Sequence, residues 1–140
     1  MSIWLVTGGS GFLGRHVLNR LQSTAPLNDR PRPILLGRRC PDDWPTEHFV
    51  TADLDAPDSL CRAVTAVRPD VVLHLAGRTP PADGPSLHRT NVGGTVALLR
   101  SLHDLASPCR MITVGSAAEL GPVPAHRLPI DEHTPCRPEG

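Results

Sequence analysis

Short apolar runs alternate along this chain with segments whose apolar residues recur at helical spacing. The runs lie at residues 3–7, 34–36, 49–52, 70–75 and 111–114, a length typical of buried strands. Most of them end at a glycine or an aspartate, residues that favour tight turns. The run at 70–75 is rich in β-branched residues and is interrupted by His74, which predicts a parallel strand covered on both faces.

Two segments between the runs predict helices. Apolar positions 13, 17 and 21 form one stripe from Phe12 to Leu21. In the second segment Asp55 is an N-cap candidate, Pro57 suits the first turn, and positions 60, 63, 64 and 67 form an apolar face. Pro69 should end this helix, because proline cannot continue one.

A third helix is expected over about residues 86–105. Positions 87, 91, 94, 98, 102 and 105 recur at helical spacing and place Asn91 and Gly94 on its buried stripe. Strands that alternate with helices imply right-handed crossovers and a parallel sheet with helices on both faces. The sequence therefore predicts an α/β fold with a doubly wound parallel sheet, of which it supplies five strands.

Charge and cysteine content narrow the classes of partner. Fourteen arginines balance fourteen acidic residues and form no basic block, so neither a nucleic acid nor a membrane is an expected partner. The four cysteines are scattered and suggest neither a zinc ribbon nor a disulfide framework. Reduced thiols, with no export signal and no apolar run of membrane length, favour a cytoplasmic protein. No metal site is expected, because no second histidine stands at ligand spacing from His74.

A glycine pattern follows the first apolar run at once. Gly9, Gly11 and Gly14 form a G-x-G-x-x-G between the predicted strand and the predicted helix. Glycines there let the backbone approach a pyrophosphate, and the free N–H groups of the helix N-terminus receive its charge. The simpler alternative is a tight turn without a ligand, but the strand-turn-helix context favours a dinucleotide site.

Four further segments follow the glycine pattern in order. They are Asp53-Leu54, His74-Leu75-Ala76-Gly77, Asn91-x-x-Gly94-Thr95 and Gly115-Ser116-Ala117-Ala118-Glu119-Leu120-Gly121. With Thr7-Gly8 in front of the glycine pattern, the whole set resembles the extended short-chain dehydrogenase/reductase family, the NAD(P)-dependent epimerases, dehydratases and reductases of nucleotide sugars. The resemblance implies a Rossmann fold, with residues 1–121 as the NAD(P)-binding domain and residues 122–140 as a proline-rich segment that leads to a catalytic helix.

The resemblance also implies roles for individual residues. Gly9, Gly11 and Gly14 would hold the cofactor pyrophosphate. Asp53 and Leu54 would flank the adenine, and Ala76 and Gly77 would pass beneath the cofactor. The other residues expected to bind the cofactor are Gly8, Phe12, Leu13, Leu75 and Asn91. Ser116 would be the hydroxyl that hydrogen-bonds the substrate oxygen during hydride transfer.

Four residues of these segments have a plainer alternative. Asp53 could be a strand-end turn residue and Ser116 a turn serine, although ligands collect at the carboxyl edge of parallel strands. Asn91 could hold helix and strand backbone together rather than touch a ligand. His74 fits a core histidine better than a ligand.

The end of the second predicted strand bears on the choice of cofactor. An NAD enzyme usually places an acid there, which binds the ribose 2′-hydroxyl. Here the sequence is Gly37-Arg38-Arg39, and a guanidinium can pair with a 2′-phosphate in bidentate fashion. NADP is therefore expected in preference to NAD, the alternative being two solvated surface arginines.

The chain contains no tyrosine and no lysine. The family's reaction needs a Tyr-x-x-x-Lys motif on the helix after the fifth strand, where the tyrosine is the general acid or base and the lysine lowers its pKa. We therefore expect the N-terminal part of a nucleotide-sugar epimerase, dehydratase or reductase, inactive by itself, whose full-length parent is a homodimer. The alternative is a non-catalytic, NADP-sensing protein built on the same fold.

Overall fold

Strands and helices alternate along the chain in the order that the sequence predicts. The computed structural model describes residues 2–24 and 30–139. The strands are β1 (Ile3–Thr7), β2 (Arg32–Gly37), β3 (Phe49–Thr51), β4 (Val71–His74) and β5 (Arg110–Thr113). The α-helices are α1 (Phe12–Thr24), α2 (Pro57–Val67), α3 (Gly84–His88) and α4 (Gly94–His103). Shorter turns are the π-helical η2 (Arg89–Gly93) and the 3-10 turns η1 (Thr46–His48), η3 (Ala117–Leu120) and η4 (Ala125–Arg127).

The five strands form one sheet in the order β3-β2-β1-β4-β5, and every neighbouring pair is parallel. The last residue of β1, Thr7, is in register with Leu36 of β2 and with His74 of β4. The carboxyl ends of these three strands therefore lie at one edge of the sheet. The strand order reverses its direction between β1 and β4, and the predicted doubly wound α/β fold is confirmed.

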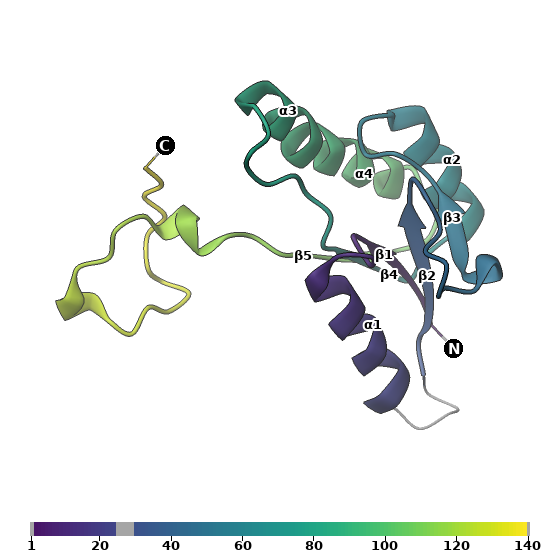
Figure 1. The fold of residues 1–140 in the computed structure, drawn as a ribbon, viewed down its shortest axis with the longest axis horizontal. Helices are drawn as coiled ribbons and strands as arrows, with labels where there is room; N and C mark the ends of the chain where they lie inside the picture. The colour runs from purple at the N-terminus through teal and green to yellow at the C-terminus, as the bar shows by residue number, and fades with distance from the viewer. Residues whose placement is uncertain (1, 25–29, 140) are drawn as a thin grey trace.

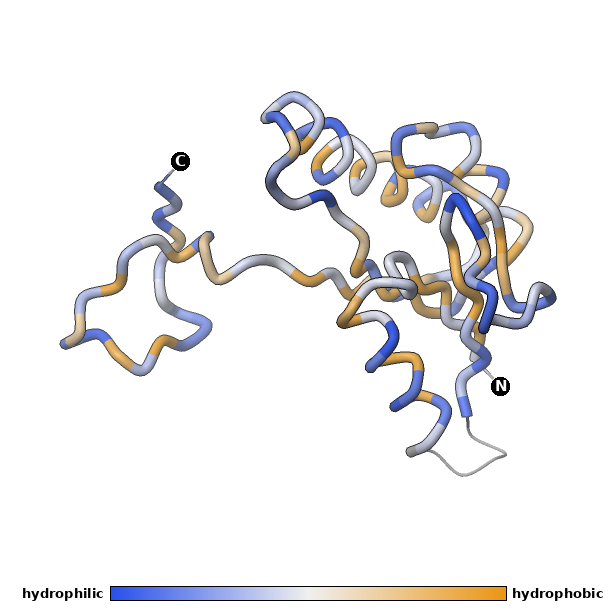
Figure 2. Tube along the Cα trace, viewed as in Figure 1, coloured by the Kyte–Doolittle hydropathy of each residue, from blue (hydrophilic) through white to orange (hydrophobic). Residues whose placement is uncertain are grey.

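β1 contributes side chains to both layers of the core. Successive residues of a strand point to opposite faces, and Leu5 and Val6 are both 0% exposed. Leu5 belongs to a large cluster with residues of α2 and α4, whereas Val6 packs with Leu18 of α1 and Leu73 of β4. Figure 1 shows α1 on one face of the sheet and α2, α3 and α4 on the other. Figure 2 shows the apolar residues of strands and helices gathered between these layers.

The second helix, α2, ends where the sequence predicts but begins differently. It stops at Val67, and Arg68 adopts the left-handed conformation (φ 48°) just before Pro69. The predicted N-cap was wrong, because the cap residue is Ala56 and makes no side-chain cap bond. The carboxylate of Asp55 instead bonds to Thr90, Arg78 and Arg89 at the carboxyl edge of the sheet.

The single helix predicted over residues 86–105 is instead three segments, α3, η2 and α4. Gly94 packs against the loop after β3, where a Cβ would lie 2.9 Å from Leu54 Cβ. The prediction that Asn91 is buried was wrong, because its side chain reaches out to the backbone of Arg78. A π turn holds one residue more than an α turn. We attribute the position of the π turn η2 to the contacts of Asn91 with Arg78 and of Gly94 with Leu54. Apolar periodicity within the segment cannot reveal such contacts.

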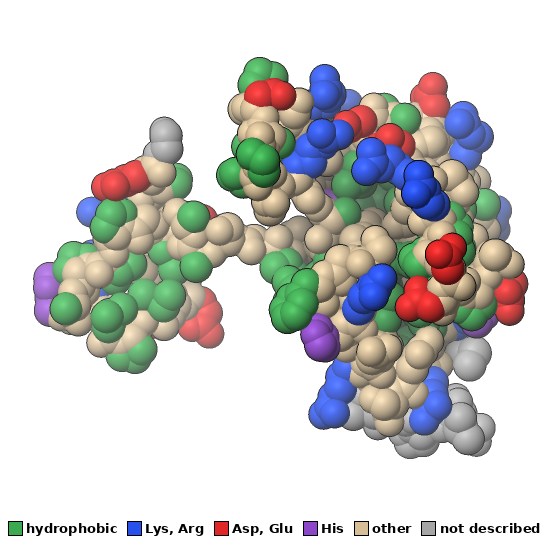
Figure 3. Space-filling view, viewed as in Figure 1, with side chains coloured by type: hydrophobic (Ala, Val, Ile, Leu, Met, Phe, Trp, Pro, Cys, Tyr) green, Lys and Arg blue, Asp and Glu red, His purple; other side chains and the backbone are tan. Residues whose placement is uncertain are grey.

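β5 forms one edge of the sheet and is poorly covered. Within the described residues it pairs on one side with β4, and Ile112 is 42% exposed. Beyond it, residues 114–139 leave the body of the molecule as an arm (Figure 1). The arm folds on itself, since the Arg137 amide donates to the Glu119 carbonyl at 3.0 Å. Figure 3 shows the arm apart from the body, with hydrophobic side chains on its surface.

Candidate functional site

A cleft of about 330 Å³ opens at the carboxyl ends of β1, β2, β3 and β4. The helices that follow β1 and β4 cover opposite faces of the sheet, so the loops after these two strands separate and leave a crevice. The cleft is lined by Thr7, Gly8, Ser10, Gly11, Leu36, Gly37, Arg38, Ala52, Asp53, Leu54, Asp55, Leu75, Ala76, Gly77, Arg78 and Thr90. The structure thus brings eight of the predicted site residues into one cleft: Gly8, Gly11, Arg38, Asp53, Leu54, Leu75, Ala76 and Gly77.

Two glycines where β1 joins α1 admit no side chain: Gly8 lies in the connecting turn and Gly14 in the first turn of α1. Gly8 has φ +71°, and a Cβ there would lie 2.6 Å from the Ala76 nitrogen. A Cβ on Gly14 would lie 2.3 Å from the Gly8 carbonyl oxygen. α1 begins at Phe12, so the first N–H groups of the helix lack partners within it and carry the positive end of its dipole. The turn is a bare backbone cradle at the mouth of the cleft, which fits a phosphate group.

Four members of the predicted glycine turn, Gly9, Phe12, Leu13 and Gly14, do not line the cleft. Gly9 lines a neighbouring hollow of about 430 Å³ between α1 and the loop after β2, and its Cβ would meet the Leu35 side chain. Phe12 and Leu13 are 79% and 54% exposed. The Phe12 ring meets the ring of His16 edge to face at 4.8 Å. A role of Phe12 and Leu13 at the cleft would therefore involve their backbone N–H groups.

The two arginines after β2 lie in different places. Arg38 lines the cleft, whereas Arg39 is not among the lining residues, and both are exposed. Gly37, just before them, also lines the cleft. A guanidinium, not a carboxylate, therefore stands where β2 ends.

Asp53 combines a turn with a place in the cleft. Its Oδ1 accepts a hydrogen bond from the Asp55 amide at 3.0 Å, and its own amide donates to Ser59 Oγ at 3.0 Å. The alternative role of a strand-end turn residue is therefore present. Because Asp53 and Leu54 also line the cleft, this role leaves a ligand contact available.

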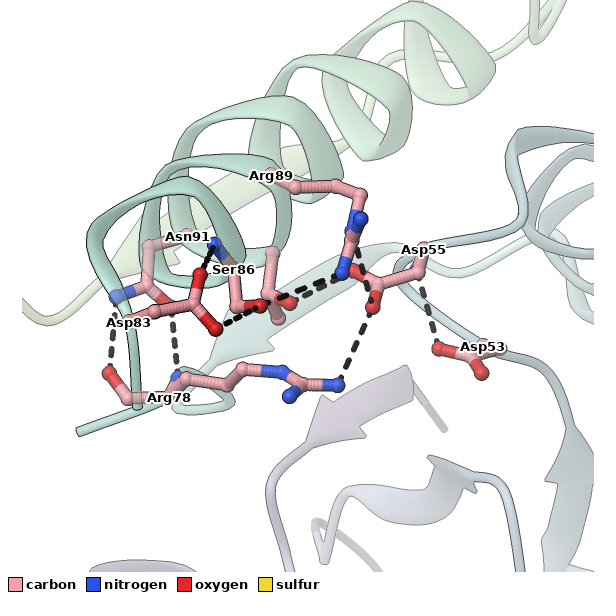
Figure 4. A network of polar contacts seen from close by, with 8 residues as sticks. Asp53, Asp55, Arg78, Asp83, Ser86, Arg89 and Asn91 are labelled. Carbon is pink, nitrogen blue, oxygen red and sulfur yellow. Dashed lines mark hydrogen bonds and ion pairs between the residues drawn. The ribbon is translucent and has the colours of Figure 1, made fainter. Parts of the chain in front are cut away.

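Asp55 is the centre of a polar cluster at the rim of the cleft (Figure 4). Its Oδ1 accepts from the Thr90 hydroxyl at 2.7 Å, and its Oδ2 lies 3.4 Å from Arg78 Nη2 and 3.8 Å from Arg89 Nε. The cluster joins the loops after β3 and β4 to the π turn. The sequence did not predict Arg78 and Thr90 as site residues, and it predicted Asp55 as a helix cap. The pattern within one segment does not show which residues of a distant loop will contact it.

Asn91 acts on the backbone beside the cleft. Its Oδ1 accepts from the Arg78 amide at 2.7 Å, and its Nδ2 donates to the Arg78 carbonyl at 2.9 Å. A Cβ on Gly77 would lie 3.2 Å from the same Oδ1. These contacts agree with the alternative role, in which Asn91 holds backbone segments together. A contact between Asn91 and a cofactor stays a prediction.

A buried polar pair, Thr7 and His74, lies at the carboxyl ends of β1 and β4, and Thr7 also lines the cleft. His74 is 4% exposed, and its Nδ1 lies 2.7 Å from Thr7 Oγ1. On the other side of the ring, Nε2 lies 3.0 Å from Thr95 Oγ1. Burial lowers the pKa of His74. The interpretation of His74 as a core histidine is consistent with these contacts.

Ser116 lies outside the cleft, at the start of the arm. Its Oγ accepts from the Ala118 amide at 3.2 Å and caps η3. This is the turn role that was the alternative for Ser116, and its substrate contact stays a prediction.

Within residues 2–24 and 30–139, no group of three or more His, Cys, Asp or Glu side chains could hold a metal ion. No helix in these two ranges has the length and apolar character needed to cross a membrane.

Residues 4–140 match the model of the NAD dependent epimerase/dehydratase family. The dTDP-6-deoxy-L-talose 4-dehydrogenase (NAD(P)(+)) of Kitasatospora kifunensis is 30% identical over 121 residues, which are 85% of this chain and 36% of that protein. This chain therefore spans about a third of the length of that relative.

Solved structures show the same fold. RMD from Pseudomonas aeruginosa complexed with NADPH is 29% identical, with a TM-score of 0.74 over 99% of this chain and 44% of that one. The UDP-glucose 4-epimerase of Thermus thermophilus in complex with NAD is 25% identical, with a TM-score of 0.75 over 97% of this chain and 44% of that one.

Proposed function

Because this chain belongs to the NAD dependent epimerase/dehydratase family, we propose that its cleft binds the adenosine and pyrophosphate of a nicotinamide cofactor. The observation that carries the proposal is the β1–α1 turn. A Cβ on Gly8 or Gly14 would collide with backbone atoms, and the bare turn opens onto a cleft of about 330 Å³. A pyrophosphate needs such close access to backbone N–H groups at a helix N-terminus.

The proposal assigns parts of the cofactor to parts of the cleft. Gly11 and the first N–H groups of α1 hold the pyrophosphate. Asp53 and Leu54 flank the adenine, and the loop of residues 75–77 passes beneath the cofactor. When bound, the cofactor supplies a carbon that accepts and returns hydride. This chain's own residues bind and orient it, and Asn91 keeps the loop after β4 in place through the Arg78 backbone.

We propose NADP in preference to NAD. Arg38 lines the cleft at the end of β2, where a ribose 2′-phosphate would meet a guanidinium rather than a carboxylate. The two solved relatives described above hold NADPH in one case and NAD in the other, so the fold accommodates both. The preference therefore rests on Arg38.

The proposed substrate class is a nucleotide sugar. The relatives named above include a dehydrogenase of a dTDP-deoxysugar and an epimerase of UDP-glucose. In the full-length protein, proposed to be a homodimer, Ser116 would hydrogen-bond the substrate oxygen at which hydride transfer takes place. The four cysteines are free thiols, which suits a reducing compartment such as the cytoplasm.

A titration followed by NMR tests the cofactor site. NADPH is added to the ¹⁵N-labelled chain, and the amide signals are followed. The expected result is saturable shifts of Gly8, Gly11 and Ala76, with α2 signals such as that of Thr65 unchanged as the internal control. No saturable shift, or shifts confined to the hollow between α1 and the loop after β2, would contradict the proposal.

A further inference from the structure

A chain of hydrogen bonds beneath the cleft joins three elements. Thr7 ends β1 and His74 ends β4, and they are 0% and 4% exposed. Thr7 Oγ1 lies 2.7 Å from His74 Nδ1, and His74 Nε2 lies 3.0 Å from Oγ1 of Thr95 in α4. None of the roles assigned above to the cofactor-binding residues uses His74.

The outer partners of the two threonines decide where the protons lie. The Ala76 amide donates to Thr7 Oγ1 at 3.2 Å, which leaves the hydroxyl proton of Thr7 for His74 Nδ1. At the other end, Thr95 Oγ1 donates to the Asn91 carbonyl at 2.6 Å, and a carbonyl can only accept. The Thr95 hydroxyl therefore accepts from the ring. A neutral His74 therefore carries its proton on Nε2.

The surroundings of the ring favour the same form. Within the described part of the chain, its hydrogen-bond partners are Thr7 and Thr95, and no ionisable side chain bonds to it. Burial lowers the pKa of His74 and so disfavours a second proton. A proton on Nδ1 would also take away the acceptor that the Thr7 hydroxyl uses.

The chain of bonds connects two segments that line the cleft. Thr7, at the end of β1, and Ala76, in the loop after β4, are both among the lining residues. The backbone of the glycine turn packs closely against the loop after β4, since a Cβ on Gly8 would lie 2.6 Å from the Ala76 nitrogen. At the far end, the residue that accepts from Thr95 is Asn91, whose side chain holds the backbone of Arg78 at the rim.

We propose that His74 is a positioning residue: held as the Nε2–H tautomer between Thr7 and Thr95, it fixes the loop after β4 against the glycine turn and so sets the width of the cleft. The inference rests on the proposed function in taking this cleft as the cofactor site. His74 touches no ligand in this role. It acts through Thr7, Ala76 and Asn91.

The tautomer is tested first, on the wild-type chain without ligand. A long-range ¹H–¹⁵N spectrum of the histidine rings distinguishes a protonated ring nitrogen from an unprotonated one. We expect one histidine with an unprotonated Nδ1 and a protonated Nε2 that keeps this state at about pH 6.5, the ordinary pKa of a histidine. A proton on Nδ1, or exchange between the two tautomers, would overturn the inference whether or not any variant folds.

The positioning role is tested with Thr95. Thr95→Val removes the acceptor of Nε2–H, and an unsatisfied buried donor is expected to lower NADPH affinity about tenfold and to shift the Gly8 and Ala76 amide signals. Thr95→Ser keeps the hydroxyl and should restore both. The control is Thr113→Val, an exposed threonine in register with His74 on β5, which should match wild type within about twofold.

The outcomes separate the two proposals. If wild type does not bind NADPH, the proposed function fails, and the amide shifts of Thr95→Val still decide whether the chain of bonds sets the cleft. If wild type binds and Thr95→Val binds equally well with unshifted amides, the positioning role is wrong while the cofactor site stands.

Discussion

Arg38 and Arg39 are neighbours in the sequence, yet Arg38 lines the cleft and Arg39 does not. We expect Arg38→Ala to lower the affinity for NADPH about tenfold, because a charge-assisted hydrogen bond to the 2′-phosphate is lost and its exposure limits the loss. The affinity for NADH should change less than about twofold. Isothermal titration of both cofactors measures this, with Arg39→Ala as the matched control.

Two results would contradict the assignment of Arg38. One is equal affinity of the wild-type chain for NADPH and NADH. The other is an Arg38→Ala variant that loses affinity for both cofactors alike, which would mean that Arg38 acts on a group that they share.

Glycines in two helical segments give a matched pair for the packing of the glycine turn. A Cβ on Gly14 would lie 2.3 Å from the Gly8 oxygen and 2.4 Å from Gly9 Cα, so backbone must move. We expect Gly14→Ala to lower the free energy of unfolding by about 2 kcal/mol or more. Gly93 has nothing within 4 Å of its Cβ position, and Gly93→Ala should raise that free energy by roughly 0.5–1 kcal/mol.

Urea unfolding followed by circular dichroism compares the two variants with wild type. If Gly14→Ala were as stable as Gly93→Ala, the turn would have room for a side chain. The close packing that makes it a cradle for a phosphate would then be refuted.

At the level of elements, the strands could be predicted because each one is a local apolar run. The helix boundaries could be predicted where a local signal sets them, as Pro69 does for the end of α2. The break in the long helix could not, since it depends on contacts of Asn91 and Gly94 with loops far away in the sequence. The cleft residues that belong to local sequence motifs could likewise be predicted. Arg78 and Thr90 at the rim of the cleft were missed, because distant segments of the chain bring them there.

β5 is expected to be less protected from exchange than the central strand β1. It pairs with β4 on one side within the described residues, and its side chains are largely exposed, whereas β1 lies between two strands. Native-state hydrogen exchange should therefore show faster exchange for residues 111–113 than for residues 4–6. Equal protection in a monodisperse sample would mean that another segment covers this edge in solution.

For the molecule as a whole, His74 links stability to pH. Burial lowers the pKa of His74 in the folded state below its ordinary value of about 6.5. The unfolded chain therefore takes up this proton first. The contribution to stability is complete above about pH 6.5 and is lost as the pH falls from there to the folded-state pKa, by at most about 1.4 kcal/mol per pH unit.

Urea unfolding at about pH 7.5 and pH 5.5 measures this linkage. A His74→Asn variant has no group at this position that titrates in the range, so its stability should fall less between the two pH values. The same fall in both proteins would assign the effect to other groups.

The chain by itself is expected to show no oxidoreductase or epimerase turnover. It contains no tyrosine and no lysine, and loss of the proton-transfer residue typically lowers the rate by about a hundredfold or more. The hydroxyl of Ser116 cannot replace them, since an unassisted hydroxyl is a poor acid and a poor base near neutral pH. The change in cofactor absorbance after addition of nucleotide sugars measures turnover. Turnover by the wild-type chain that the Ser116→Ala substitution abolishes would refute the prediction.

The arm of residues 114–139 also has a hydrodynamic consequence. A compact chain of this length would have a radius of gyration of about 14 Å. A body that carries a projecting arm meets more friction as it diffuses, so its Stokes radius exceeds that of a sphere of equal mass (Figure 1). The monomer should therefore elute early from a gel-filtration column, toward the position of a compact dimer. Light scattering, which reports mass independently of shape, distinguishes this elongated monomer from a homodimer.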